Sequence, residues 1–184
     1  MRIKIDIDNV IRDMSGQMIV IYNSVYKRKL KKEFTKDDLK DYSVDISFPL
    51  CENKARKFFF ETNAWAVYMG AKPMKNATNG LKKLKEMGHE IILVSYQPTK
   101  ESKEYTLKWL QKWGIPYDAI VFTNNKDKTI VQADYIIDDN PEFLDMDSAK
   151  KVCIDWPYNR KLKYDYRVKS INDFAKKLKE AENE

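Results

Sequence analysis

The chain begins Met1-Arg-Ile-Lys-Ile-Asp-Ile-Asp8, a short apolar run that ends in the aspartates Asp6 and Asp8. Short apolar runs of this kind predict β-strands. We expect five, at residues 3–7, 91–94, 119–122, 135–137 and, with the weakest pattern, 152–154. Segments with apolar residues at helical spacing lie between or after these runs, at residues 77–87, 103–113 and 171–178. Strands that alternate with helices predict a parallel sheet covered by helices.

Residues 11–72 interrupt this alternation with long segments of helical pattern. Three helix signals lie within them: residues 14–34, the capping-box sequence Thr35-Lys36-Asp37-Asp38, and residues 51–69. We therefore expect a helical insertion after the first strand, with an α/β core formed by residues 1–10 and 73–184. The length of 184 residues suits one such core with a small accessory element, and is too short for two full domains.

The composition excludes several classes of protein. A hydrophobic fraction of 43% is enough for a folded core, and no apolar run approaches the roughly 20 residues that span a membrane. The first eight residues carry four charges among apolar ones, which argues against a signal peptide. The two cysteines, Cys51 and Cys153, form no C-x-x-C pair, so neither a disulfide framework nor a thiolate metal site is indicated. We expect a cytoplasmic protein with reduced thiols.

The formal net charge of +6 comes mostly from lysines spread along the helical stretches. Lysines in this arrangement usually form a solvated helix face, which we favour over a specific site for a polyanion. A positive field would still help to attract an anionic substrate.

Charged and hydroxyl side chains recur where the predicted strands end or lead into loops. In chain order they are Asp6, Asp8, Ser95, Lys128, Asp138 and Asp139. Open parallel sheets bind ligands at the carboxyl ends of their strands, so we expect these side chains to meet there. Carboxylate oxygens suit Mg²⁺, and a lysine together with a hydroxyl suits phosphate oxygens. Clustered aspartates would repel one another without a cation, which also favours a divalent ion.

This order of residues resembles the four motifs of the haloacid dehalogenase-like (HAD) superfamily, and the resemblance covers nearly the whole chain. Residues 126–139, Lys-Asp-Lys-Thr-Ile-Val-Gln-Ala-Asp-Tyr-Ile-Ile-Asp-Asp, are similar to the 5′(3′)-deoxyribonucleotidases and their bacterial relatives. Trp156-Pro-Tyr-Asn-Arg160 is similar to the same family. The resemblance implies a three-layer, Rossmann-like α/β core with a parallel sheet, and a small helical type-one cap inserted after the first strand.

The resemblance also implies roles for the four aspartates. Asp6 would be the nucleophile that attacks phosphorus, and a ligand of Mg²⁺. Asp8 would protonate the leaving oxygen and then activate water, and its backbone carbonyl would bind the metal. Asp138 would be the second carboxylate ligand, while Asp139 would bind the metal through water or orient its neighbours.

Ser95 and Lys128 would hold the phosphate oxygens in the resembled family. The implied reaction is Mg²⁺-dependent hydrolysis of a phosphomonoester through an aspartyl-phosphate intermediate. The implied substrate is a deoxy- or ribonucleoside 5′-monophosphate, with deoxy and pyrimidine nucleotides among the candidates, and the sequence does not fix the base or the sugar. Neither a membrane nor a nucleic acid is expected as a partner, and a homodimer is common in the family.

Three residues depart from the family pattern. Asn9 and Asn76 stand where glycine is common, and Ser95 stands where threonine is frequent. None of the three changes removes a catalytic group.

Aromatic residues are concentrated near the end of the predicted insertion, as Phe58-Phe59-Phe60 and then Trp65 and Tyr68. Trp65 and Tyr68 are candidates for stacking on a nucleobase. The alternative, which we favour, is that they form the core of the small helical cap.

Two further functions are compatible with the sequence. A related phosphatase could act on a sugar phosphate or, given the excess of lysine, on a nucleic-acid end. A protein of the same fold could instead bind a ligand without turnover, although the complete set of acid, base and metal ligands argues against this. His89, the only histidine, lies beside Gly88 in a predicted turn and offers no base for a Ser-His or Cys-His triad.

Overall fold

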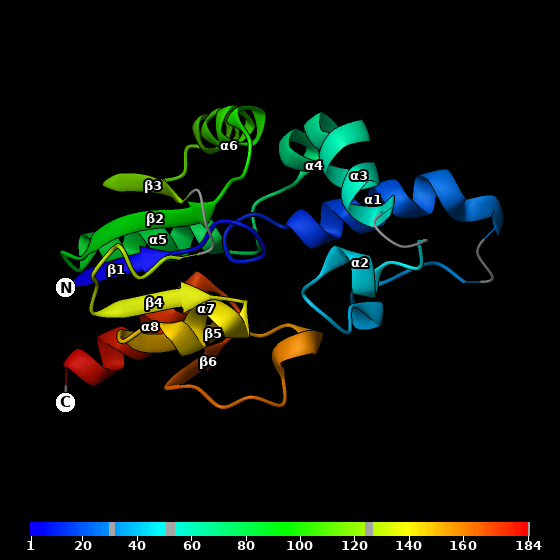
Figure 1. Ribbon diagram of the computed structural model, residues 1–184. Coiled ribbons are helices and arrows are strands. Elements are labelled where there is room, and N and C mark those ends of the chain that lie inside the picture. The colour runs from blue at the N-terminus through cyan, green and yellow to red at the C-terminus, as the bar shows by residue number, and fades with distance from the viewer. Residues whose placement is uncertain (30–31, 51–53, 124–126, 184) are drawn as a thin grey trace.

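The computed structural model describes residues 1–29, 32–50, 54–123 and 127–183. Within these residues, six parallel strands form one sheet in the order β3-β2-β1-β4-β5-β6 (Figure 1). The strands are β1 (Arg2–Ile5), β2 (Glu90–Tyr96), β3 (Ala119–Thr123), β4 (Tyr135–Asp138), β5 (Lys150–Ile154) and β6 (Tyr166–Val168). The predicted parallel sheet is confirmed. The edge strand β6 is additional to the five predicted, because Tyr-Arg-Val is too short and too polar to form an apolar run.

Helices cover both faces of the sheet. In Figure 1, α5 (Ala77–Glu86) and α8 (Ile171–Glu182) pack against each other behind the sheet, and α7 (Pro141–Met146) lies in front, against β4 and β5. α5 and α8 approach closely at Gly80, where an added Cβ atom would lie 2.3 Å from the backbone nitrogen of Asn172. The sheet and its two layers of helices form the predicted three-layer core.

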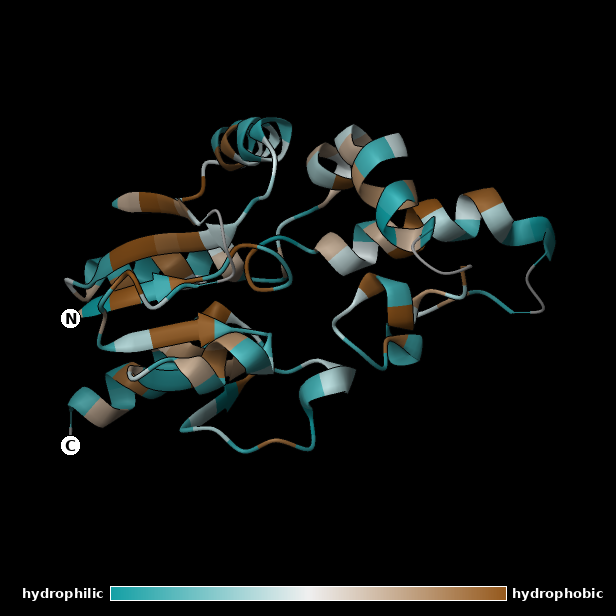
Figure 2. Ribbon diagram, in the orientation of Figure 1, coloured by the Kyte–Doolittle hydropathy of each residue, from teal (hydrophilic) through white to brown (hydrophobic). Residues whose placement is uncertain are grey.

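The central strands are apolar because both of their faces are covered. Ile3, Ile5, Leu93, Ile137 and Val152 are completely buried. Figure 2 shows β2 as predominantly hydrophobic, whereas the helices alternate between hydrophobic and hydrophilic residues. This contrast is the pattern from which strands and helices were predicted.

Two of the core helices end at glycines that adopt left-handed backbone angles. α5 is followed by Gly88 with φ +82°, and α6 (Lys100–Lys112) is followed by Gly114 with φ +56°. Glycine takes this conformation without steric strain, so it ends helices efficiently. The predicted turn at Gly88 is confirmed, and its neighbour His89 lies between α5 and β2 with its side chain buried.

The helices between β1 and α5 lie beyond the carboxyl ends of the strands (Figure 1). We call this group the helical block (residues 14–70). Its α-helices are α1 (Met14–Tyr26), α2 (Val44–Ser47), α3 (Lys54–Lys57) and α4 (Ala64–Gly70). Its two connections to the core run side by side, since the Asp13 amide donates to the Lys72 carbonyl and the Met74 amide donates to the Ile11 carbonyl, both at 2.8 Å. The division into a core and a cap of residues 11–72 stays a prediction.

Two long helices predicted in this block are wrong in detail. The first ends at Tyr26 and continues as a short 3₁₀ turn (Lys27–Lys29). Of the rest of this predicted helix, residues 30 and 31 lie outside the described residues, and residues 32–34 are not helical. The capping box of Thr35 and Asp38 is present, but it begins only a 3₁₀ turn (Lys36–Asp38).

The second predicted helix, residues 51–69, is divided between α3, a π-helical turn (Phe58–Thr62) and α4. The break follows from Asn63, whose side-chain amide donates to the Phe58 carbonyl at 2.9 Å and so competes with the helical hydrogen bonds of the backbone. Cys51 lies outside the described residues.

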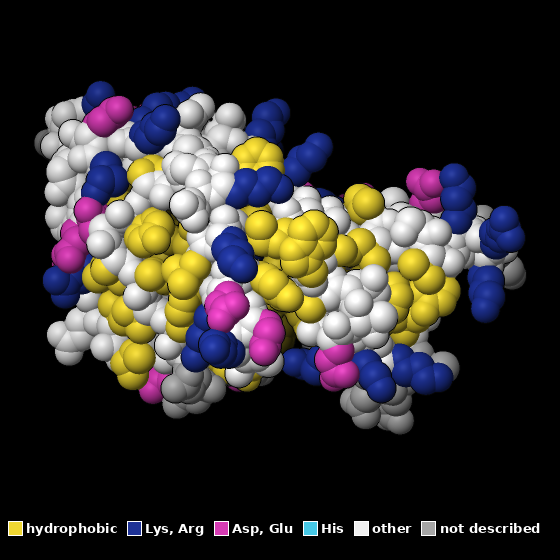
Figure 3. Space-filling view, turned by 90° about the horizontal axis from the view of Figure 1, so that it is seen from above, with side chains coloured by type: hydrophobic (Ala, Val, Ile, Leu, Met, Phe, Trp, Pro, Cys, Tyr) yellow, Lys and Arg dark blue, Asp and Glu magenta, His cyan; other side chains and the backbone are white. Residues whose placement is uncertain are grey.

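The surface agrees with the expectation of solvated lysines. On the face seen in Figure 3, lysines and arginines are spread over the surface and hydrophobic side chains lie among them. Exposed large hydrophobic residues include Trp65, Leu107 and Trp113. No helix in the described part of the chain is long and apolar enough to cross a membrane. Cys153 is a free, buried thiol.

Candidate active site

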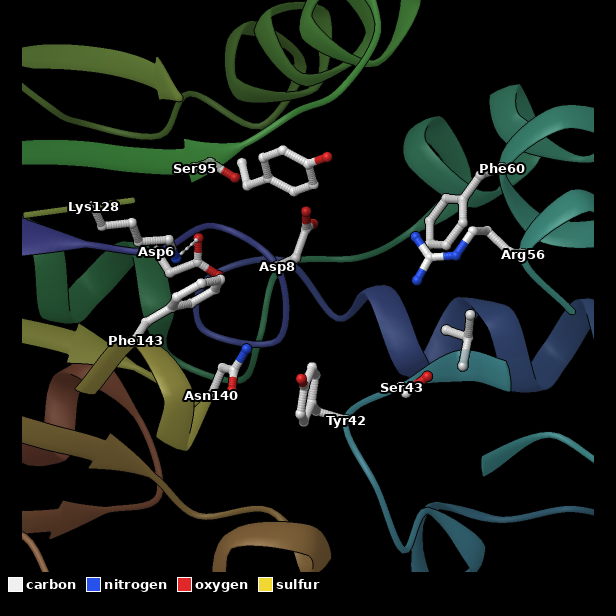
Figure 4. A pocket seen from close by; sticks show the side chains of 12 residues that line it. Asp6, Asp8, Tyr42, Ser43, Arg56, Phe60, Ser95, Lys128, Asn140 and Phe143 are labelled. Atoms are coloured by element: carbon white, nitrogen blue, oxygen red, sulfur yellow. Dashed lines mark ion pairs between the residues drawn. The ribbon is translucent and has the colours of Figure 1, made fainter. Parts of the chain in front are cut away.

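The carboxyl ends of β1, β2 and β4 meet at one pocket, as the strand pattern predicted. Asp6 follows β1, and its amide continues the sheet by donating to the Ile137 carbonyl at 2.9 Å. Ser95 lies near the end of β2, and Lys128 lies in the loop after β3. Asp6, Asp8, Ser95 and Lys128 all line a cavity of about 250 Å³ (Figure 4).

Lys128 bridges two of the predicted carboxylates. Its Nζ atom lies 2.7 Å from Asp6 Oδ1 and 2.7 Å from Asp138 Oδ2, and its side chain is only 4% exposed. Burial alone would lower the pKa of Lys128, but the negative charges of Asp138 and Asp6 raise it above its ordinary value. The lysine is therefore a fixed positive charge at the floor of the pocket. Its Nζ also lies 4.3 Å from the centre of the Phe143 ring, an attractive cation–π contact.

A second buried lysine, Lys4 on β1, holds the loop that carries Lys128. Its Nζ donates to the carbonyls of Val131 at 2.6 Å and Lys128 at 3.3 Å, and it forms an ion pair with Asp147. The sequence pattern did not reveal this role. The one sign of this role in the sequence is a lysine that stands among the apolar residues of a predicted strand.

Three carboxylates form a candidate metal site. Asp6, Asp138 and Asp139 each offer one oxygen, and these oxygens all lie within 4.8 Å of one another. Burial, opposed by Lys128 and reinforced by Asp138, raises the pKa of Asp6 to about 7. Burial also raises the pKa of Asp139 well above its ordinary range. A buried cluster of hard oxygen donors that resists ionisation fits a divalent cation such as Mg²⁺, whose charge would stabilise the ionised carboxylates.

The Trp156–Arg160 segment, which resembles the deoxyribonucleotidases, holds Asp139 in place by hydrogen bonds. The Tyr158 hydroxyl donates to Asp139 Oδ2. The side-chain amide of Asn159 donates to the Asp139 carbonyl and to the Ile154 carbonyl, both at 2.8 Å. Because these bonds lock the backbone after β4, the segment supports the candidate metal site, and none of its residues is among the described residues that line the pocket.

Asp8 has a different environment from the other aspartates. Its Oδ1 atom accepts a hydrogen bond from Arg12 Nε at 2.7 Å, and its Oδ2 atom accepts one from Gln97 Nε2 at 3.0 Å. Gln97 Nε2 also lies 3.1 Å from Ser95 Oγ. Neither Arg12 nor Gln97 was predicted as a site residue, because only the folded chain brings them to Asp8.

Two of the three departures from the family pattern have a common physical cause. Asn9 has φ 60° and Asn76 has φ 62°, both in the left-handed region that favours glycine. Asparagine tolerates this region better than most residues, so it replaces glycine here at low strain. Asn9 also accepts a hydrogen bond from the Ser15 amide at 2.9 Å, which secures the turn after Asp8.

The opposite wall of the pocket comes from the helical block (Figure 4). Tyr42, Ser43, Val44, Arg56 and Phe60 contribute to it. Tyr42 reaches the core through a 3.0 Å hydrogen bond between its hydroxyl and Glu142 Oε2. Arg56 forms an ion pair with Asp45 at 3.3 Å and keeps 63% of its side chain exposed.

Neither aromatic residue singled out for stacking is among the described residues that line the pocket. Trp65 is 65% exposed on α4. Tyr68 is buried, with its ring centre 4.9 Å from the guanidinium carbon of Arg12. The aromatic residues that do line the pocket are Tyr42, Phe60, Tyr96 and Phe143. Base stacking by Trp65 or Tyr68 stays a prediction, without support from this geometry.

Residues 1–181 match the family described as 5′ nucleotidase, deoxy (pyrimidine), cytosolic type C protein. The chain belongs to this nucleotidase family. The match spans the pocket, the helical block and the Trp156–Arg160 segment, so the predicted relationship is confirmed along almost the whole chain. Membership in the family makes the protein an enzyme of the phosphatase class.

Solved structures show the same fold as this nucleotidase-family chain. A haloacid dehalogenase-like family hydrolase from Streptococcus pneumoniae has a TM-score of 0.68 at 14% identity, covering 96% of this chain and 97% of its own. A "predicted phosphatase" from Clostridium acetobutylicum has a TM-score of 0.62 at 17% identity, covering 97% and 98%. A HAD hydrolase from Entamoeba histolytica has a TM-score of 0.61 at 12% identity, covering 93% of each chain. No curated protein matches the chain in sequence.

Proposed function

We propose that the protein is a Mg²⁺-dependent 5′-nucleotidase that hydrolyses nucleoside monophosphates through an aspartyl-phosphate formed on Asp6. The observation that carries the proposal is the position of Lys128, paired with both Asp6 and Asp138 at the floor of the pocket. The family description, with its words "deoxy (pyrimidine)", supports pyrimidine deoxynucleotides as the first substrates to test. Its word "cytosolic" supports the expected cytoplasmic location.

Asp6 is the proposed nucleophile for phosphorus. A carboxylate and a phosphate dianion repel each other, and the ammonium of Lys128 beside Asp6 reduces this repulsion. The Ser95 hydroxyl accepts a hydrogen bond from Gln97, so its own proton is free to be donated to a phosphate oxygen. Attack by Asp6 divides hydrolysis into two displacements, each easier than direct attack by water on the ester.

The metal would be held by Asp6 and Asp138, with Asp139 and the backbone carbonyl of Asp8 as further donors. When bound, Mg²⁺ would neutralise negative charge on the phosphate oxygens and on the buried carboxylates. The donor set fits this ion because it is made of oxygen atoms and is buried.

Asp8 is the proposed acid and base. It lines the same cavity as Asp6 but belongs to neither the carboxylate cluster nor the Lys128 ion pairs. From this place it would donate a proton to the departing 5′ oxygen, and then accept one from the water that cleaves the aspartyl-phosphate. Asp6 and Asp8 line one pocket but have different ion-pair and hydrogen-bond partners, so they suit two different catalytic roles.

The helical block would act as a cap over the phosphate site. It supplies one wall of the pocket, and Tyr42 spans the opening to Glu142. A cap that closes over the site would exclude water and favour small substrates over polymers. Equal rates on a mononucleotide and on a long 5′-phosphorylated oligonucleotide would contradict this part of the proposal.

The test is phosphate release with Mg²⁺ from a panel of nucleoside 5′- and 3′-monophosphates, sugar phosphates and p-nitrophenyl phosphate. Strong turnover of a few nucleotides that is lost with EDTA and in Asp6→Asn would support the nucleotidase. Turnover of sugar phosphates alone would keep the chemistry but reject the substrate. No turnover of any ester would favour a binding protein of the same fold.

A further inference from the structure

Asp8 stands apart from the other aspartates of the site because a buried arginine fixes its side chain. Arg12 Nε donates to Asp8 Oδ1 at 2.7 Å, and the arginine is completely buried. The Asp8 side chain keeps 26% of its surface exposed, so it would otherwise be free to adopt other rotamers toward solvent. With Gln97 Nε2 on Oδ2 at 3.0 Å, both carboxylate oxygens have a protein donor.

The backbone after β1 explains why Arg12 reaches Asp8. The amides of Ile11 and Arg12 both donate to the Ile7 carbonyl, at 3.0 and 2.9 Å, so residues 7–12 form a tight turn. The Asn9 amide donates to the Arg12 carbonyl at 2.8 Å and closes the turn. The turn therefore brings the side chain of Arg12 back to Asp8, four positions earlier in the chain.

The guanidinium is held on its other sides by residues far away in the sequence. Its Nη2 atom donates to Thr106 Oγ1 on α6 at 3.1 Å. Its central carbon lies 4.9 Å from the ring centre of Tyr68 and 5.3 Å from that of Trp109. Trp109 is itself fixed, since its Nε1 atom donates to the Ala71 carbonyl at 2.7 Å. Arg12 therefore has a single well-defined position between α4 and α6.

Stability alone does not explain such an arrangement. Removing a guanidinium from water is costly, and a buried ion pair often adds little net stability compared with apolar side chains of similar size. A rigid ion pair does, however, give a catalytic side chain one orientation, and small misplacements at a reacting centre can reduce rates by roughly 10²-fold.

We propose that Arg12 is a positioning residue that holds the Asp8 carboxylate toward the leaving oxygen of the substrate, with Gln97 as the second support. This inference rests on the proposed function, in which Asp8 donates a proton to that oxygen. Arg12 itself is not among the described residues that line the pocket, so it acts through Asp8 rather than on the substrate. Tyr68, a candidate for base stacking from the sequence, would serve as the platform for this guanidinium.

The first experiment compares two leaving groups in Arg12→Met, a variant that keeps side-chain length and removes the hydrogen bonds. An alkoxide such as the 5′ oxygen of a nucleoside needs a proton to depart, whereas p-nitrophenolate does not. We measure kcat/KM, which reports only the steps up to release of the alcohol. The ratio of kcat/KM for the nucleotide over that for p-nitrophenyl phosphate should fall at least ~10-fold, since a general acid contributes ~10²–10⁴-fold. An unchanged ratio would overturn the proposal.

The second experiment is a double-mutant cycle on the nucleotide alone. With Asp8→Asn already present, Arg12→Met should lower kcat/KM by no more than ~3-fold further, because residues that act as a unit are not additive. A purely structural arginine would give the same loss in both backgrounds, and additivity would therefore reject the positioning role. If the unmodified enzyme hydrolyses neither ester, the proposed function fails instead.

Thr106→Val provides a milder variant in case Arg12→Met does not fold. It removes the acceptor of the 3.1 Å bond from Arg12 and leaves the pocket untouched. The leaving-group ratio should change in the same direction by a smaller factor, while the thermal melting curve remains cooperative. A folded Thr106→Val enzyme with lower rates but an unaltered ratio would count against the proposal.

Discussion

The two walls of the pocket are built in different ways. The core wall consists of residues at strand ends and in the loops that follow them, such as Ser95 and Lys128, which are 1% and 4% exposed. The wall from the helical block consists of residues on short helices and loops, such as Tyr42, which is 46% exposed, and Arg56, whose side chain is 63% exposed. The reacting end of the pocket is therefore held by the packed sheet, while the other end includes side chains that are more exposed to solvent. This difference suggests that the core determines the chemistry and the helical block determines the substrate.

The largest expected effect is on the core wall, in Asp6→Asn. Loss of the nucleophile should lower kcat by at least ~10⁴-fold on every ester, because the variant removes a covalent step rather than a contact with one substrate. The melting temperature without metal should not fall, because Asp6 is a buried carboxyl whose pKa is already raised. Phosphate release and thermal melting check the two halves of this prediction. A lower melting temperature would show that the loss of activity comes partly from misfolding.

Replacing Lys128 by methionine should damage both stability and activity. It leaves Asp6 and Asp138 without their shared cation, and breaking a buried ion pair from one side costs roughly 3–5 kcal/mol. Urea denaturation at pH 8 should show this loss, and Mg²⁺ should recover part of it by replacing the missing positive charge. The matched control is Lys85→Met, which removes a partly exposed lysine paired with Asp118. Equal losses in the two variants would contradict the special position of Lys128.

Metal binding should stabilise the protein more at high pH than at low pH. In the metal-free protein the pKa of Asp6, about 7, lies above its unfolded value near 3.9. The folded state therefore binds more protons between these values, and stability from this group is lost as the pH rises through 7. Mg²⁺ needs the ionised carboxylate, so the increase in melting temperature on adding Mg²⁺ should be larger at pH 8 than at pH 5.5. An equal increase at both pH values would refute the proposed role of Asp6 as a ligand.

The smallest effects should come from the helical block, and they should depend on the substrate. Phe60→Ala removes an aromatic ring from the pocket wall, and stacking on a base is worth roughly 1–3 kcal/mol. We expect kcat/KM to fall by ~5–100-fold on nucleotides and by much less on p-nitrophenyl phosphate. Trp65→Ala is the matched control, because Trp65 is exposed and outside the described lining of the pocket. A larger effect of Trp65 than of Phe60 would restore the stacking role considered from the sequence.

Prediction from the sequence was more successful for the core wall of the pocket than for the wall from the helical block. Ser95, Lys128 and the aspartates were found because parallel strands bring their carboxyl ends to one edge, so order along the chain implies proximity in space. The helix predicted over residues 51–69 was too long, because periodicity does not show that the Asn63 side chain competes with the helical hydrogen bonds. The strand β6 carries too few apolar residues to be seen at all.

The supporting contacts of the site could not be predicted for a different reason. Arg12 and Thr106 are 94 positions apart, and Lys4 and Val131 are 127 positions apart. Periodicity and motif spacing describe neighbours along one element, whereas these pairs depend on how separate elements pack. Asn9 and Asn76 are an intermediate case. The sequence shows that they stand where glycine is common, but only the structure shows their positive φ values.

The sequence by itself determined the class of fold and the family, and it supplied the set of proposed reacting groups, because alternating strands and helices and their terminal residues are encoded locally. Only the tertiary structure decided which aromatic residues face the pocket, that Tyr68 is buried against Arg12, and that Asp8 is paired differently from Asp6. These properties depend on burial and on contacts between distant segments. They exist only once the helical block has packed beside the carboxyl ends of the sheet.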